Sequence, residues 1–84
     1  MSRAQKLVNR TIEILERRRD NHLNDQKALA EISGLLERTP DSGVGTASEQ
    51  VKLARKILQQ HKENALTNPQ AMSALYRLFA IATR

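Results

Sequence analysis

Apolar residues recur along the first part of the chain at the spacing of an amphipathic helix. One face, at roughly 100° per residue, collects Leu7, Val8, Thr11, Ile14 and Leu15. The same spacing returns at Leu29, Ile32, Leu35 and Leu36. It ends before Thr39, where the following Pro40 disfavours a helical backbone. No stretch alternates apolar and polar residues with the period of two that strands require, so the pattern predicts an all-α protein.

Residues 20–25 leave two alternatives open within this part of the chain. Five of the six residues there have weak helix propensity, which is typical of a turn between two helices. However, neither glycine nor proline interrupts the segment, and apolar spacing continues across it with a period of seven, at Val8, Leu15, His22, Leu29 and Leu36. We therefore favour one continuous helix over residues 3–38, with a break at 20–25 as the alternative.

A continuous first helix has a consequence for the assembly. At 1.5 Å per residue, ~36 residues would extend over ~54 Å, whereas a compact chain of this length is only about 25–30 Å across. A second chain would then have to cover the exposed apolar seam, so we expect a homodimer. Its interface would involve Leu15, Leu29, Ile32, Leu36, Leu75 and Phe79. A helix broken at 20–25 would instead let the chain close on itself as a four-helix monomer.

The second half of the chain carries two helix-start signals. A loop over residues 39–46 is followed by Thr46 and Glu49, which have the spacing of a capping box and predict a helix over 47–66. Asn68 and Pro69 then combine an N-cap residue with proline at the first helical position, which predicts a helix over 69–83.

The last predicted helix is apolar nearly all round, so more than one of its sides should be buried. With these elements, we expect residues 1–84 to form a single domain, a small bundle of three to four helices completed by homodimerisation.

Charge gives the clearest indication of a partner. Lys and Arg outnumber Asp and Glu by 14 to 9, for a net charge of +5 and an isoelectric point of about 10.3. Such a balance favours anionic partners. On helix 47–66, one arc separated from the apolar residues collects Lys52, Arg55, Lys56, Gln59 and Lys62. These side chains would form a ridge about 15 Å long, which matches a few successive phosphates.

Other interpretations of the basic residues remain open. An ordinary solvent-exposed helix face would present the same arc without binding anything. A second, weaker stripe on the first helix is interrupted by Glu13 and consists of Arg3, Lys6, Arg10 and Arg17. Because only two aromatic residues occur, the stacking platforms of single-strand binders are missing. A duplex held by its backbone fits better, and A-form RNA is recognised largely in that way.

Composition argues against several other classes of function. The chain has no cysteine and only two histidines, so we expect no metal site. No catalytic constellation and no phosphate-binding loop can be assembled, so we expect neither a cofactor nor an enzyme. No apolar run approaches the ~20 residues of a membrane span, and Glu13 comes too early for a signal peptide. We therefore expect a cytoplasmic location without membrane association.

The stretch KLARKILQQHKENALTNPQAMSALYRL, residues 52–78, contains a basic helix and then a short helix that starts at proline. A long amphipathic helix and a loop come before it. This order resembles the small RNA-silencing suppressors of nodaviruses, which are basic helical dimers that bind double-stranded RNA. The resemblance implies a viral suppressor of RNA silencing whose RNA contacts come from Lys52, Arg55, Lys56 and Lys62. The alternative function is a small helical adaptor or inhibitor that binds an acidic or grooved protein partner through the basic face or through helix 69–83.

Overall fold

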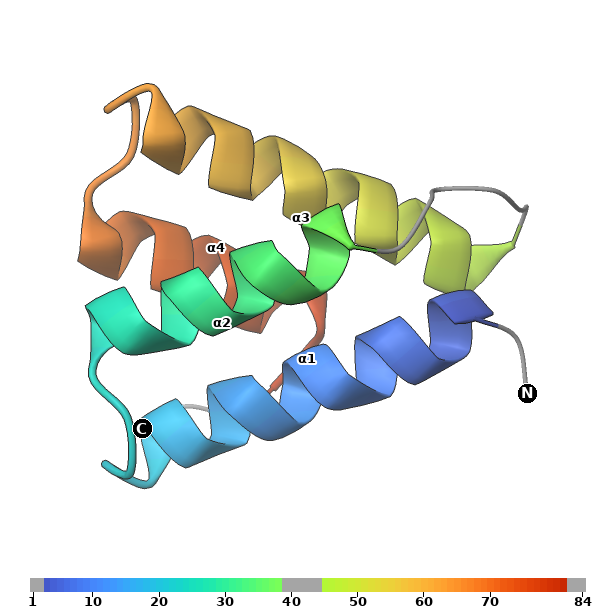
Figure 1. Ribbon diagram of the computed structural model, residues 1–84, viewed down its shortest axis with the longest axis horizontal. Coiled ribbons are helices and arrows are strands. Elements are labelled where there is room, and N and C mark those ends of the chain that lie inside the picture. The colour runs from blue at the N-terminus through green and yellow to red at the C-terminus, as the bar shows by residue number, and fades with distance from the viewer. Residues whose placement is uncertain (1–2, 39–44, 82–84) are drawn as a thin grey trace.

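The computed structural model describes residues 3–38 and 45–81, and these fold into four helices (Figure 1). They are α1 (Arg3–Arg19), α2 (Asp25–Glu37), α3 (Thr46–Lys62) and α4 (Asn68–Leu78). No strand occurs in these two ranges, which confirms the all-α class and the small bundle. Most of the predicted loop 39–46, namely residues 39–44, lies outside the described residues.

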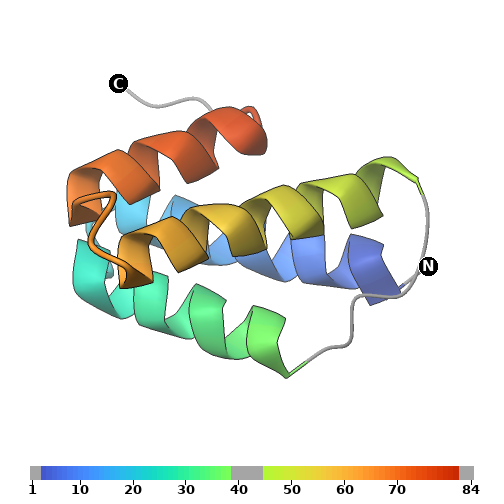
Figure 2. The same cartoon turned by 90° about the horizontal axis from the view of Figure 1, so that it is seen from above.

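The helices form two antiparallel hairpins, α1 with α2 and α3 with α4, that pack against each other. α1 and α3 run in the same direction and approach each other at their N-terminal ends (Figure 1), while α3 lies between α2 and α4 when seen from above (Figure 2). The extents are 30 × 27 × 19 Å and the Cα radius of gyration is 11.9 Å. Within a single chain, the bundle therefore closes on itself.

The continuous helix that the seven-residue spacing favours is wrong, because α1 and α2 are separated by a tight turn. Asn21 adopts a left-handed backbone with φ of 65°, and the His22 amide donates to the Arg17 carbonyl at 2.8 Å. These are the features of a Schellman motif that ends α1. Asn24 then caps α2, since its side chain accepts a hydrogen bond from the Lys27 amide at 2.7 Å. The alternative with a break at 20–25 is the observed structure.

The other two hairpin helices end in the same way. Asn64 has φ of 64° and Ala80 has φ of 54°. In each case the amide of the next residue donates to the carbonyl five residues earlier, at 2.8 Å and 2.9 Å respectively. α3 therefore ends at Lys62, four residues before the predicted end at 66, and α4 ends at Leu78 rather than at 83.

The start of α3 differs from its prediction. Gly45, with φ of 116°, is the N-cap residue, and no side chain makes a capping hydrogen bond there. The capping box predicted from Thr46 and Glu49 is therefore wrong, because the helix begins at Thr46 itself. An extended left-handed φ of this kind favours glycine, so the glycine takes the position that the threonine was expected to fill.

The start of α4 is capped by a residue that the sequence interpretation passed over. The Thr67 hydroxyl accepts from the Gln70 amide at 3.3 Å, and the Gln70 side chain accepts from the Thr67 amide at 3.0 Å, which completes a capping box. Pro69 lies in the first turn as predicted, but Asn68 is helical rather than the N-cap. Its side-chain oxygen instead lies 2.6 Å from His61 Nε2, which ties the end of α3 to the start of α4.

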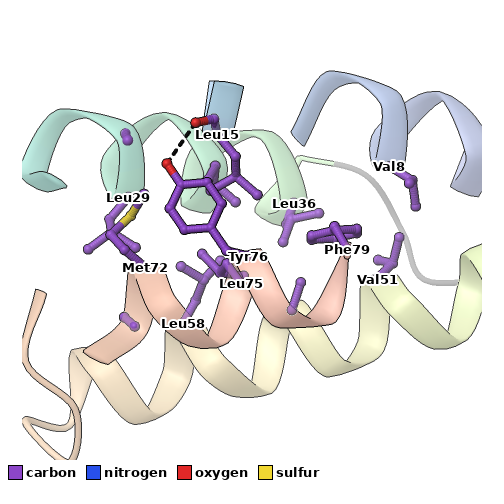
Figure 3. Packing of buried hydrophobic residues seen from close by; sticks show 14 of the residues in the cluster. Val8, Leu15, Leu29, Leu36, Val51, Leu58, Met72, Leu75, Tyr76 and Phe79 are labelled. Carbon is purple, nitrogen blue, oxygen red and sulfur yellow. Dashed lines mark hydrogen bonds between the residues drawn. The ribbon is translucent and has the colours of Figure 1, made fainter. Parts of the chain in front are cut away.

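The core is built from all four helices (Figure 3). It contains each residue that was predicted for a dimer interface: Leu15, Leu29, Ile32, Leu36, Leu75 and Phe79. The exposed fraction of these side chains is 8% or less in the single chain. Their assignment to a dimer interface is therefore corrected, because they pack against each other within one chain and have almost no surface left for a second one.

One polar contact fixes α4 against α1 inside this core. The Tyr76 hydroxyl donates to the Leu15 carbonyl at 2.7 Å (Figure 3). The side of α4 that carries Ser73 and Arg77 stays exposed. In the part of the chain that the structure describes, none of the helices combines the length and the apolar character needed to cross a membrane.

Candidate nucleic-acid interface

The basic face of α3 is positioned by the apolar side of the same helix. Val51, Ala54 and Leu58 are buried in the core, which turns the opposite side of α3 toward solvent. We define the α3 basic face as the exposed residues Lys52, Lys56, Gln59 and Lys62. The structure thus brings four of the five predicted contact residues onto one accessible surface.

Arg55, the fifth predicted contact residue, has a structural role that the sequence does not reveal. Its side chain is partly buried, and Nη2 donates to the Leu36 carbonyl at 2.8 Å. Leu36 belongs to the last turn of α2, where carbonyl groups lack partners within the helix and the helix dipole favours a cation. Arg55 therefore joins α3 to the C-terminal end of α2, and we no longer count it among the exposed contact residues.

A groove of about 340 Å³ lies between α2 and α3 at one edge of the basic face. Its walls include Gln59 and Lys62 from α3, with Ser33 and Glu37 from α2. Gln59 Nε2 donates to a Glu63 carboxylate oxygen at 3.1 Å. The carboxylates of Glu37 and Glu63 therefore flank the α3 basic face at its groove edge. Lys52 and Lys56 lie farther toward the start of the helix.

The lysines of the α3 basic face keep their full charge for a partner. Within residues 3–38 and 45–81, ion pairs join Arg18 to Asp25 and Arg19 to Asp20. None involves Lys52, Lys56 or Lys62 in those ranges. Because no carboxylate of the described residues forms an ion pair with these three ammonium groups, each can release counterions from a bound phosphate.

The weaker stripe on α1 is exposed but does not form a uniform basic surface. Its members Arg3, Lys6, Arg10 and Arg17 all face solvent. Arg10 and Arg17 line a groove between α1 and α2 together with Glu13 and Glu31. The mixture of signs there favours local charge compensation over binding of a polyanion.

The fold also brings together cations that the sequence interpretation did not connect. Arg18 and Arg19 at the end of α1 line the same groove as Arg77 of α4. They lie far apart in the sequence, so no spacing rule could have found them. In the described ranges, no three His, Asp or Glu side chains are arranged to hold a metal ion.

Comparison with known proteins adds no family to these observations. No protein-family model, no curated protein and no solved structure matches this chain.

Proposed function

We propose that this protein binds duplex nucleic acid, preferably double-stranded RNA, through the α3 basic face and without reading the sequence. The observation that supports the proposal most directly is the exposure of Lys52, Lys56 and Lys62 on one helix without ion pairs in the described ranges. The net charge of +5 acts in the same direction, because it raises the local concentration of polyanions.

The dimensions of α3 suit a duplex backbone. From Lys52 to Lys62 the helix rises about 15 Å, which spans a few phosphates of one strand. Lysine ammonium groups would neutralise those phosphates, while the Gln59 amide would hydrogen-bond to a phosphate or a 2′-hydroxyl. A surface of this kind recognises the shape and charge of A-form RNA rather than its bases, which explains the proposed lack of sequence preference.

The biological role that follows from the nodavirus resemblance is suppression of RNA silencing. Binding of duplex RNA is the biochemical property on which such a role depends. The structure differs from the predicted order in one respect that affects the proposal: the first helix is broken, so no long helical face extends along α1 and α2. We therefore take a single chain and its α3 basic face as the binding unit.

Titration of duplex RNA at several salt concentrations tests the proposal. With about three phosphates neutralised, log K should fall against log salt with a slope of about −2 to −3. The double variant Lys52→Glu/Lys56→Glu should lose binding at low salt. The control variant Arg19→Glu/Arg77→Glu changes the net charge by the same amount at another surface and should still bind the RNA. Lack of RNA binding at ~50 mM salt, or an equal loss in both variants, would reject the α3 basic face as the site.

The alternative role as an adaptor or inhibitor loses one of its two predicted docking surfaces. The apolar face of α4 lies in the core, with Met72 2% exposed and Leu75 fully buried. Docking through the apolar face of helix 69–83 would therefore require the bundle to open. The α3 basic face could still bind an acidic protein, and in that case the titration with duplex RNA would show no binding.

A further inference from the structure

A groove of about 1140 Å³ separates the C-terminal end of α1 from the outer face of α4. It has more than three times the volume of the α2–α3 groove, which is about 340 Å³. Among the helices of the described residues, α1 and α4 make the least extensive contact with each other. It lies apart from the α3 basic face, with which it shares no lining residue.

The charge of the groove is predominantly positive. Arg18, Arg19 and Arg77 line it, and its lining contains one carboxylate, that of Asp20. Arg18 is paired with Asp25, so Arg19 and Arg77 are the cations that a ligand would meet. Asp20 lies 3.4 Å from Arg19 in an exposed pair, and an incoming carboxylate can replace a contact of this kind at little cost. Guanidinium groups bind carboxylates in a bidentate manner, so arginine suits this role better than lysine.

The wall contributed by α4 is a single helix face with a small polar residue at its centre. Ser73 is exposed between the buried Met72 and Tyr76, while Pro69 and Ala80 lie at the two ends of this face. From Pro69 to Arg77, both within α4, the helical rise corresponds to about 12 Å. A small side chain at the centre leaves room for an inserted chain, and the apolar ends offer contacts to aliphatic side chains.

The lining of the groove favours one class of anionic ligand over the others, among a nucleic-acid duplex, a single strand and an acidic peptide. A nucleic-acid duplex is too wide to enter a space between neighbouring helices of one bundle, whose axes are typically ~8–10 Å apart when packed. A single strand gains its affinity from stacking on aromatic rings, but Tyr76 is only 9% exposed. A peptide segment fits the mixture of charge and small apolar surface in the lining of the groove.

We infer that the α1–α4 groove is a docking site for an acidic amphipathic segment of a protein partner. Carboxylates of that segment pair with Arg19 and Arg77, and its small aliphatic side chains lie over Ser73 and Ala80. The inference rests on the complementarity between the two arginines Arg19 and Arg77 and an acidic ligand, and it does not depend on RNA binding by α3.

Fluorescence anisotropy with a defined probe tests the inference. The probe is a labelled helical peptide of about 12 residues, about 18 Å long, with Glu and Leu on one face. Two peptides in which Gln or Lys replaces every Glu serve as ligand controls. The acidic peptide should bind, and Arg19→Glu/Arg77→Glu should weaken its binding about tenfold. Ser73→Trp should weaken it similarly, because the indole fills the groove without changing the charge.

The variant Lys52→Glu/Lys56→Glu provides the matched control, because it changes the net charge equally on the α3 basic face and should bind the peptide as the wild type does. Circular dichroism verifies that each variant is folded. The inference is overturned if the acidic peptide does not bind, or if the Gln peptide binds equally well. It is also overturned if the α3 variant loses binding instead, or if the protein alone dimerises through Arg19 and Arg77, which would make a second copy the occupant.

Discussion

At the scale of single residues, left-handed backbone conformations end three of the four helices. Asparagine occupies two of these positions, Asn21 and Asn64, and alanine occupies the third, Ala80. Asparagine tolerates this conformation because its short polar side chain can hydrogen-bond locally, whereas the Cβ of alanine lies too close to the neighbouring carbonyl. Ala80 therefore carries a strain that the two asparagines largely avoid.

Replacing Ala80 by glycine should raise stability. Relief of the left-handed conformation gains about 1–2 kcal/mol, and the greater freedom of glycine in the unfolded chain offsets about 0.4–1 kcal/mol of it. The expected net gain of about 0.5–1 kcal/mol would raise Tm by a few degrees in a domain of this size. Ala30→Gly, at an exposed helical position of α2, is the control and should lower stability by about the same amount. An unchanged or lower Tm for Ala80→Gly would contradict the strain argument.

Tyr76 combines a buried ring with a hydrogen bond to the main chain of another helix. Burial raises the pKa of its phenol above the ordinary value, although the nearby Arg18 guanidinium opposes this shift. The folded state thus holds the phenolic proton more tightly than the unfolded state. The resulting stabilisation is fully present below the unfolded pKa of about 10 and disappears as pH rises through the higher folded pKa.

Tyr76→Phe should therefore lower stability at neutral pH by about 1 kcal/mol, because the hydrogen bond to the Leu15 carbonyl is lost. The difference between the two proteins should shrink above about pH 10, where the unfolded wild type gains stability by ionising. Denaturant unfolding at a series of pH values measures both effects. Since this is the chain's single tyrosine, phenolate absorbance reports its ionisation directly. A difference that stays constant into the alkaline range would contradict the raised pKa.

At the scale of helices, local capping chemistry overrides the long-range apolar spacing. The spacing at Leu15, His22 and Leu29 is compatible with one helix, but Asn21 and Asn24 provide an end and a start within four residues. The prediction noted the weak helix propensity of residues 20–25 but gave more weight to the absence of glycine and proline there. It therefore missed Asn21 as a helix end and Asn24 as a helix cap. The helical faces, in contrast, were predicted well, because a 3.6-residue period fixes which residues face the core once a helix forms.

The residues of the candidate site could also be predicted only in part from the sequence. Spacing on a helical wheel placed Lys52, Lys56, Gln59 and Lys62 together, and the structure keeps them together. Arg55 lies on the same arc, but its partner is a carbonyl on α2, at Leu36. Periodicity describes one helix at a time, so contacts between helices could not be predicted from it. The arginine groove between α1 and α4 escaped prediction for the same reason.

The two helix starts in the second half of the chain allow a matched comparison of threonines. Thr67→Ala removes the hydroxyl that accepts from the Gln70 amide and should cost about 1 kcal/mol of stability. Thr46→Ala should change stability by less than about 0.5 kcal/mol, because Gly45 is the N-cap and no side chain caps α3. Denaturant midpoints of the two variants test this directly. Equal losses of stability in the two variants would instead support the capping box that the sequence predicted at Thr46 and Glu49.

At the scale of the whole molecule, the break between α1 and α2 changes the expected assembly. The reason for a dimer was a helix of ~54 Å with an uncovered seam. The 17 residues of α1 extend over only about 26 Å, which fits within the 30 Å length of the bundle. The apolar residues of the seam are covered by α3 and α4 of the same chain. Within the described residues, Leu53 is the large apolar side chain that stays exposed, at 48%.

We therefore expect the protein to sediment as a monomer, with a mass that does not change with concentration. One exposed leucine offers far less apolar surface than the ~800 Å² per partner that a stable interface buries. Sedimentation equilibrium over a wide concentration range measures this, and Leu53→Lys should leave the result unchanged. A mass that rises toward two chains would contradict the monomer. Loss of that dimer in Leu53→Lys would then place the interface on α3, next to Lys52 and Lys56, where a second copy would compete with RNA for the same face.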